Sequence, residues 1–191
     1  MIFATILKTK TNTMKKLILS LAVIAAALSV NAQAKTSSSS ASRFKPSVGL
    51  ELAVPVGDFK TGRSFGIGGT VQGDYWVDPT FAITGQAGYI SFIGKDYTVA
   101  GFTIKPGAQG IIPLLAGIKY KFSPMVYASA QLGTGIFTAP KGGSGSSSTF
   151  AYAPGIGFQV SPNFDILVKY QAYSKNGSTL GSFGTRLAYT F

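Results

Sequence analysis

Few residues in this chain could do catalytic chemistry, because it contains neither histidine nor cysteine. Without them the usual Ser-His-Asp and Cys-His nucleophile arrangements cannot form, and the commonest transition-metal ligands are missing. Six carboxylates remain, of which Asp58, Asp78 and Asp96 lie in links between patterned segments, where aspartate commonly shapes turns. We therefore expect a protein that is not an enzyme and that carries neither a metal nor a cofactor.

A second group of charges falls inside patterned segments and has a structural use. The group comprises three anions and three cations: Glu51, Asp74, Asp165, Lys119, Lys169 and Arg186. Such charges can neutralise one another in ion pairs, whereas a buried charge without a partner is costly. They are spread over five of these segments, so a fold must bring them together.

The segments that carry these charges alternate between apolar residues and small or polar residues. In the last one, Phe183, Leu187 and Tyr189 lie on one face, while Gly184 and Arg186 lie on the other. This period of two is typical of strands with two different faces. Eight such segments follow one another, at residues 47–56, 65–77, 81–89, 112–122, 125–137, 150–160, 164–173 and 182–191. Each approaches or exceeds the roughly 9–11 residues of a tilted transmembrane strand.

The connections between these segments alternate between short and long. Short proline-containing turns are expected at 77–80, 123–125 and 161–163, and longer links rich in Gly, Ser and Lys at 57–64, 94–109, 139–148 and 174–180. Bacterial outer-membrane barrels have short periplasmic turns and long outer loops. The pattern therefore predicts an all-β, eight-stranded, antiparallel, up-and-down transmembrane barrel.

The apolar faces are expected to contact lipid. A soluble, lipocalin-like barrel would instead place them around an internal ligand and expose the other faces to water. Those other faces carry mostly Gly, Ala, Ser, Thr and Gln, and only 12% of the chain is charged, against roughly 25% in soluble proteins. Aromatic residues also cluster at the strand ends, among them Tyr75, Trp76, Tyr120, Phe164 and Tyr189 at the short-turn end. Aromatic belts of this kind belong to membrane barrels.

The N-terminal region predicts export. Lys15 and Lys16 precede an apolar run at 17–30, with small residues at Ala32 and Ala34, which is the order of a secretory signal peptide. We expect residues 1–34 to be removed, by cleavage after Ala34 or Ala32, and residues 35–43 to form a Ser-rich linker before a barrel at 44–191. A retained helical anchor is the alternative. Four of the 17 basic residues lie in the leader, which leaves 13 against 6 acidic residues, a net charge of +7.

Several stretches resemble a known family. They are Leu50–Phe59 (LELAVPVGDF), Ala116–Phe122 (AGIKYKF), Tyr127 with Leu132-Gly133, and the terminal LAYTF. Together they are similar to the outer membrane protein β-barrel domain family, with its small OmpX-like and OmpA-like barrels, over essentially residues 44–191. The resemblance implies an outer-membrane location. It also implies that Leu187, Tyr189 and Phe191 form the C-terminal signal for the barrel assembly machinery.

Counting along the strands places the charges of the lumen. Glu51, Lys169 and Arg186 fall near mid-height on the first, seventh and eighth strands, which closure makes consecutive neighbours. Asp74, Lys119 and Asp165 form a lower tier. Side chains fill the interior of an eight-stranded barrel, so we expect these charges to pair and close the lumen. The alternative is that they line a gated path for small solutes.

The expected function is a structural or surface-interaction role exercised through the long loops, with a narrow porin-like channel as the alternative. Expected partners are outer-membrane lipids, lipopolysaccharide and the assembly machinery. Neither a nucleic acid nor a second copy of the chain is expected. Loop cations that could face lipopolysaccharide phosphates are Lys60, Arg63, Lys95, Lys105, Lys141 and Lys175.

Overall fold

The computed structural model describes residues 43–99, 102–104, 107–138 and 145–191. The expected signal peptide, residues 35–42 of the expected linker, Lys105 and Lys141 therefore lie outside the described residues. The described part of the chain falls within one compact unit, Ser42–Phe191. None of the helices in these described ranges is long and apolar enough to cross a membrane.

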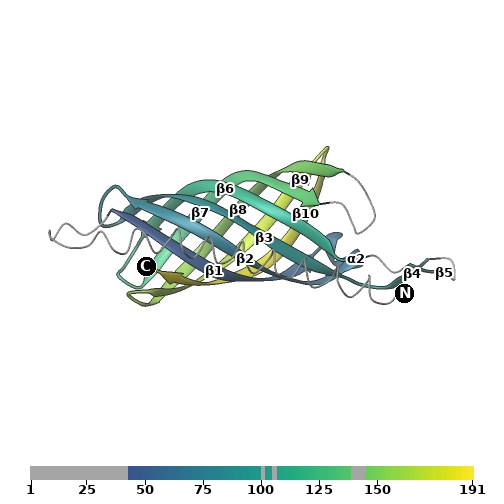
Figure 1. The fold of residues 1–191 in the computed structure, drawn as a ribbon, viewed down its shortest axis with the longest axis horizontal. Coiled ribbons are helices and arrows are strands. Elements are labelled where there is room, and N and C mark those ends of the chain that lie inside the picture. The colour runs from purple at the N-terminus through teal and green to yellow at the C-terminus, as the bar shows by residue number, and fades with distance from the viewer. Residues whose placement is uncertain (1–42, 100–101, 105–106, 139–144) are drawn as a thin grey trace, which may run out of the picture. The chain divides into compact units, whose positions relative to one another are not determined.

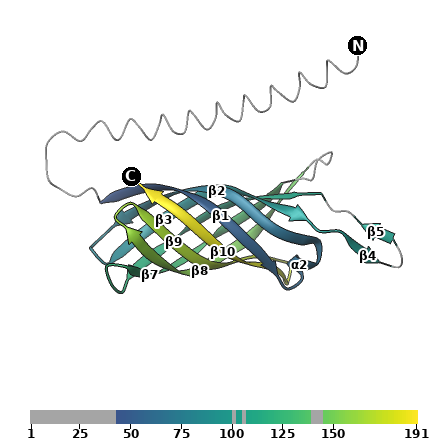
Figure 2. The same cartoon turned by 90° about the horizontal axis from the view of Figure 1, so that it is seen from below.

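Eight long strands form one closed antiparallel barrel (Figures 1 and 2), which confirms the predicted architecture. Their order around the barrel is β1-β10-β9-β8-β7-β6-β3-β2. The strands are β1 (Phe44–Val56), β2 (Arg63–Trp76), β3 (Phe81–Gly94), β6 (Gln109–Lys121), β7 (Val126–Thr138), β8 (Ser146–Ser161), β9 (Phe164–Lys175) and β10 (Ser178–Thr190).

The barrel closes where its first strand pairs with its last. The β1–β10 pairing runs from Ser47 opposite Thr190 to Val56 opposite Gly181. In hydrocarbon, an open sheet edge would leave a row of backbone groups without hydrogen-bond partners. The closure satisfies this edge, and it also fixes which inward-facing side chains become neighbours.

One end of the barrel, which we call the turn side, carries the three expected short turns. At the β2–β3 turn, Asp78 Oδ1 accepts hydrogen bonds from Thr80 N at 2.7 Å, Thr80 Oγ1 at 2.6 Å and Phe81 N at 2.9 Å. These bonds favour the carboxylate, and the bond from the Thr80 hydroxyl contributes most to lowering the pKa of Asp78 below its ordinary value. At the β8–β9 turn, Asn163 Nδ2 donates to Thr190 O at 2.8 Å, which ties the turn to the end of β10.

The opposite end, the loop side, differs in part from the expectation. The β1–β2 link contains a short helix, α2 (Phe59–Gly62), and the β3–β6 link contains a hairpin of β4 (Tyr97–Val99) and β5 (Phe102–Ile104). The expected long link at 174–180 is wrong, because the strands continue to Lys175 and Ser178. Asn176 and Gly177 have φ values of 49° and 80°, and this dipeptide suits a two-residue hairpin turn because both residues tolerate positive φ.

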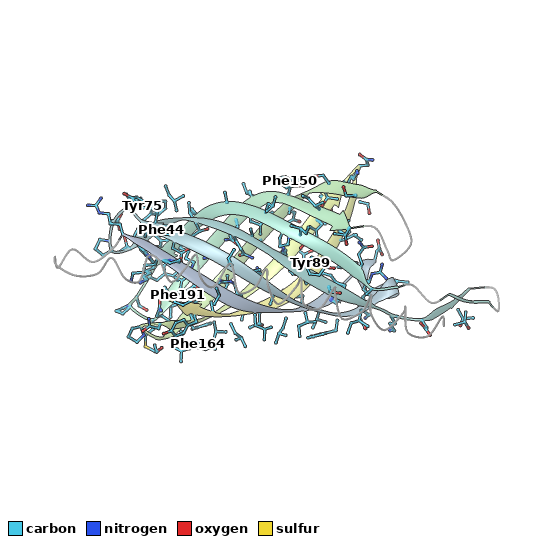
Figure 3. The ribbon with its side chains drawn as sticks, in the orientation of Figure 1. Phe44, Tyr75, Tyr89, Phe150, Phe164 and Phe191 are labelled. Carbon is cyan, nitrogen blue, oxygen red and sulfur yellow. The ribbon has the colours of Figure 1, made fainter. Side chains whose placement is uncertain are left out.

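The alternating pattern correctly separates the two faces of the strands. Large apolar residues are exposed on the outer face, as expected for side chains that meet lipid. Aromatic side chains gather toward the two ends, with Phe44, Tyr75, Phe164 and Phe191 on the turn side and Tyr89 and Phe150 toward the loop side (Figure 3). Trp76 is an exception to the predicted belt. It shares the inward parity of Asp74 on β2, and its indole N–H is buried.

Candidate functional site

The barrel interior is the candidate site, because it gathers all six charged residues singled out in the sequence. Each occupies an inward position of its strand, and each is at most 5% exposed. The inward parity follows directly from the outward parity of the apolar neighbours, since successive strand residues point to opposite faces. The six residues form two groups at different heights.

The first group, which we call the Glu51 hub, joins β1, β9 and β10. Lys169 Nζ donates to Glu51 Oε1 at 2.9 Å, and Arg186 Nε lies 3.9 Å from the same oxygen. Direct pairing of Glu51 with Arg186 across the β1–β10 closure, and of Lys169 with Gly184 across β9–β10, produces this arrangement. The structure thus brings together the three charges that strand counting placed at mid-height.

Neutral polar groups complete the Glu51 hub. Oε1 of Glu51 also accepts hydrogen bonds from Gln86 Nε2 at 3.1 Å and Thr70 Oγ1 at 3.3 Å. Arg186 donates from Nε to Thr70 Oγ1 at 2.9 Å and from Nη2 to Ser47 Oγ at 3.0 Å. These bonds offset part of the cost of removing the charges from water.

A glycine makes room for the guanidinium of the hub. A Cβ at Gly49 would lie 2.7 Å from Arg186 Nε and 2.9 Å from its Cζ. Gly49 therefore allows the Arg186 side chain to lie directly against the β1 backbone.

The second group, the turn-side cluster, lies nearer the short turns. Lys119 Nζ donates to Asp74 Oδ2 at 2.7 Å, and Asp165 Oδ1 accepts a hydrogen bond from the Tyr127 hydroxyl at 2.7 Å. Lys119 Nζ also lies 4.8 Å from the centre of the Tyr127 ring. Asp74 and Lys119 therefore pair directly, whereas Asp165 joins them through Tyr127. The tyrosine's inward position is visible in the sequence, but its bridging role is not.

The two groups balance each other in formal charge. The Glu51 hub contains two cations and one anion, and the turn-side cluster contains one cation and two anions. The six buried charges therefore sum to zero. The network links β1 with β9 and β10, β2 with β6, and β7 with β9 across the lumen.

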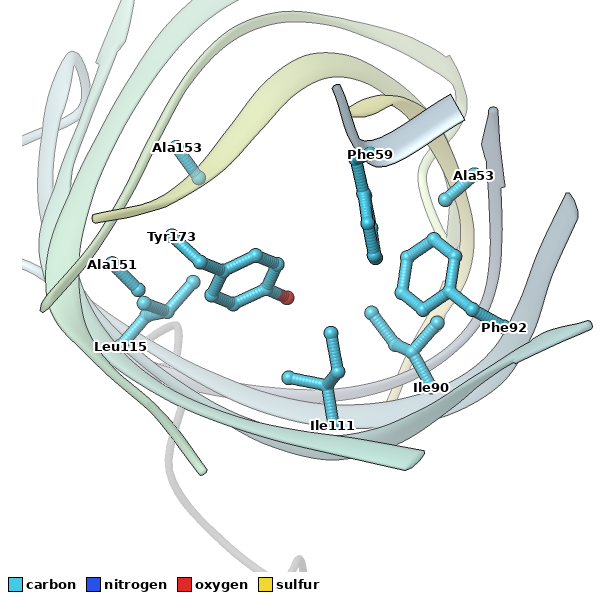
Figure 4. Close-up of a cluster of buried hydrophobic side chains, with 9 residues drawn as sticks. All are labelled: Ala53, Phe59, Ile90, Phe92, Ile111, Leu115, Ala151, Ala153 and Tyr173. Carbon is cyan, nitrogen blue, oxygen red and sulfur yellow. The ribbon is translucent and has the colours of Figure 1, made fainter. Parts of the chain in front are cut away.

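The loop-side half of the interior is apolar, which corrects the expectation of a small and polar lumen throughout. Figure 4 shows side chains from several strands and from α2 pointing into the barrel. We call this the apolar cluster. It comprises Ala53, Phe59, Ile90, Phe92, Ile111, Leu115, Ala151, Ala153 and Tyr173, with Phe137 and Leu180 packed against it. The sequence signal was available, because Ile90 and Phe92 continue the inward parity of β3 beyond the predicted end at Tyr89.

Phe59 covers the apolar cluster on the loop side of the barrel. It belongs to α2, it is 5% exposed, and its ring centroid lies 4.8 Å from that of Phe92. The β1–β2 link, which the sequence pattern predicted to be an outer loop, thus inserts an aromatic side chain into the mouth of the barrel.

The remaining candidate residues lie on the outside. Lys60 is exposed on α2, and Arg63 Nη1 donates to Gly107 O at 3.1 Å. Lys95 N donates to Gly62 O at 3.1 Å, which places Lys95 beside Arg63 at the β2–β3 rim. Lys175 Nζ donates to Ser147 Oγ at 2.6 Å across the β8–β9 rim. Leu187 and Tyr189 share the outward face of β10, Phe191 follows the end of that strand, and the Tyr189 and Phe191 rings are 5.3 Å apart.

Comparison with known proteins identifies the family. Residues 20–191 match the family model described as outer membrane protein beta-barrel domain. The chain belongs to this family. It is thus a β-barrel protein of the outer membrane, as the sequence resemblance implied. Among curated proteins, none is similar enough in sequence to count as a match.

Solved structures of other small barrels share the fold. The crystal structure of Ail, the attachment invasion locus protein of Yersinia pestis, is 20% identical with a TM-score of 0.52, over 78% of this chain and 97% of Ail. Ail in a phospholipid bilayer nanodisc gives a TM-score of 0.55 at 20% identity, over 77% and 99%. Neisserial surface protein A gives 0.50 at 17% identity, over 78% and 98%. At these identities the likeness establishes the fold alone.

Proposed function

We propose that this outer membrane protein β-barrel is a non-enzymatic, monomeric barrel with a closed lumen, whose biological contacts are made by its outer loops. The observation that carries the proposal is the filling of the interior at three levels: the turn-side cluster, the Glu51 hub and the apolar cluster under Phe59. An apolar layer above a neutral charge network opposes ion passage, because an ion there would lose its hydration without gaining ligands.

The loop side supplies the surface for such contacts. Lys60 and Arg63 lie in and just after α2, and Lys95 follows Gly94, the residue that pairs with Arg63 at the loop-side end of β2 and β3. Cations in this position suit the phosphate groups of lipopolysaccharide, since charge-assisted hydrogen bonds are the stronger kind. In this proposal the signal peptide at 1–34 directs export and is cleaved, and Leu187, Tyr189 and Phe191 are read by the barrel assembly machinery during insertion.

Orientation is tested by cysteine labelling in intact cells. The chain has no native cysteine, so single variants give unambiguous labels. Ser146→Cys, at the loop-side start of β8, is expected to react with a membrane-impermeant maleimide. Asn163→Cys, in the exposed β8–β9 turn, is expected to react only after the outer membrane is permeabilised. The opposite labelling pattern would show that the turn side faces outward and would remove the surface role from these loops.

Conductance tests closure of the lumen. The protein, refolded into a planar bilayer, is expected to show no steady ohmic current, while a porin handled identically serves as the positive control. The competing function is a gated channel for small solutes, because inward charges also tune selectivity in channels. A steady current that disappears on heat denaturation and changes its ion selectivity in Arg186→Glu would establish that channel instead.

A further inference from the structure

We propose that the turn-side mouth of the barrel contains a binding site for one small oxyanion, a phosphate or carboxylate group, with Lys45, Lys121 and the indole N–H of Trp76 as its donors. The site lies in a recess lined by these three residues and, more deeply, by members of the turn-side cluster. It is separate from the Glu51 hub and the outer loops.

Strand parity builds the recess. Lys45, Trp76 and Lys121 lie at the turn-side ends of β1, β2 and β6, two residues beyond the inward-facing Ser47, Asp74 and Lys119, respectively. All three therefore take the inward parity. They form part of the rim through which the interior meets the solution on this side.

Charge in the recess is unevenly compensated. Three lysines line it with two aspartates, Asp74 and Asp165. Asp74 is bound by Lys119 at 2.7 Å, and Asp165 accepts the Tyr127 hydroxyl. Among the described carboxylates, none forms an ion pair with Lys45 or Lys121.

The lysine side chains of the recess also act on one another. The ammonium group of Lys121 is partly buried, and those of Lys45 and Lys119 repel it, whereas Asp74 and Asp165 attract it. An anion placed among them would relieve this repulsion and would accept charge-assisted hydrogen bonds.

Trp76 provides a neutral donor and a support for Lys121. The Lys121 ammonium lies 4.2 Å from the centre of the Trp76 ring, a cation–π contact that holds the lysine over the rim. Nε1 of Trp76 is buried and finds no hydrogen-bond acceptor within the described part of the chain. A buried N–H without an acceptor is costly, and the proposal assigns this N–H as a donor to the oxygen bound in the recess that Trp76 lines.

The size of the recess limits the ligand class. Its cavity volume is about 20 Å³, slightly more than the roughly 10–15 Å³ that one water molecule needs. The recess can therefore take about one oxygen atom of a phosphate or carboxylate group, with the rest of the group at its mouth, and it cannot enclose a sugar or a nucleotide. A larger molecule could present only a terminal acidic group to it.

The experiment titrates the full barrel, folded in detergent micelles, with inorganic phosphate and separately with succinate. Trp76 is the only tryptophan of the chain, so its fluorescence reports directly on the recess, and calorimetry gives an independent binding curve. We expect a saturable change with at least one probe, and the probe that binds distinguishes a phosphate ligand from a carboxylate ligand. Failure of both probes to saturate, or the same response to sodium chloride at equal ionic strength, would overturn the proposal.

Variants locate the binding. Lys45→Gln and Lys121→Gln are each expected to raise the dissociation constant measured by calorimetry about tenfold, the loss of one charge-assisted bond. Lys60→Gln and Lys175→Gln remove the same charge on the loop side and should leave unchanged the dissociation constant that Trp76 fluorescence reports for the recess. All four variants are compared only after their unboiled samples show the folded mobility on a detergent gel. Equal effects of recess and loop variants would show attraction by net charge alone and would also overturn the site.

Discussion

Glu51→Gln is expected to lower the free energy of unfolding of the barrel by about 3–5 kcal/mol, the range for breaking a buried ion pair by removing one partner. The substitution keeps the shape of the side chain but leaves Lys169 and Arg186 as two adjacent buried cations. Their side chains are 1% and 0% exposed, so water cannot take the place of the carboxylate. Reversible urea unfolding of the folded protein in lipid vesicles measures the difference.

A chemically matched control separates burial from the loss of a carboxylate. Asp78→Asn makes the same change from carboxylate to amide in the exposed β2–β3 turn, and we expect it to cost less than about 1 kcal/mol, as for other exposed sites. Adding Lys169→Met to Glu51→Gln should recover part of the lost free energy of unfolding, because one of the two buried cations left without a carboxylate is then removed. If Glu51→Gln lowers the free energy of unfolding no more than Asp78→Asn does, then the Glu51 hub is not the main polar contribution to the stability of the barrel.

Gly133→Ala is the second substitution for which a large loss of stability is expected. Gly133 faces inward on β7, and a Cβ there would overlap the carbonyl oxygen of Leu114 on β6 and lie 2.9 Å from the Leu115 Cα. These are backbone atoms of a paired strand, so relief requires β6 and β7 to separate. Overpacking typically costs about 1–3 kcal/mol, and we expect Gly133→Ala to reach the upper part of that range.

Gly85→Ala is the control for the Gly133 prediction. Gly85 lies in β3, but no atom lies within 4 Å of the position that its Cβ would take. The same methyl group should therefore change stability by less than about 0.5 kcal/mol, as at other unconstrained sites. Urea midpoints of the two variants, measured together, decide the matter. Equal losses would mean that strand propensity, and not the approach of the β6 backbone, explains the glycine at position 133.

The alternation of apolar and polar residues predicted the strands. Counting residues from the turns predicted that the three charges of the Glu51 hub meet. This worked because the side-chain period of a strand is two, and because closure of an up-and-down barrel makes the first and last strands neighbours. Glu51 could thus be matched with Arg186 by counting residues from the turns. The number of strands and the lipid-facing surface followed from the same pattern and from the low content of charge.

Other features depended on contacts that a one-dimensional pattern does not contain. Trp76 was assigned to the aromatic belt by residue type, although its parity on β2 points inward. The apolar cluster was missed because the predicted third segment stopped at Tyr89, before Ile90 and Phe92. The bridge from Tyr127 to Asp165 requires the distance across the lumen, which sequence does not supply. The tight Asn176-Gly177 turn was recognisable from its residue types, but its Ser- and Lys-containing surroundings were assigned to a loop.

The insertion of Phe59 has an evolutionary consequence. Among the described residues of the loop-side connections, Phe59 of the β1–β2 link belongs to the buried apolar cluster, so changes in this link would expose the barrel interior. The β9–β10 connection is reduced to two residues and offers little material for variation. Diversification of the outer surface among relatives should therefore be concentrated in the β3–β6 and β7–β8 connections. The position of Phe59 should instead retain a large apolar residue.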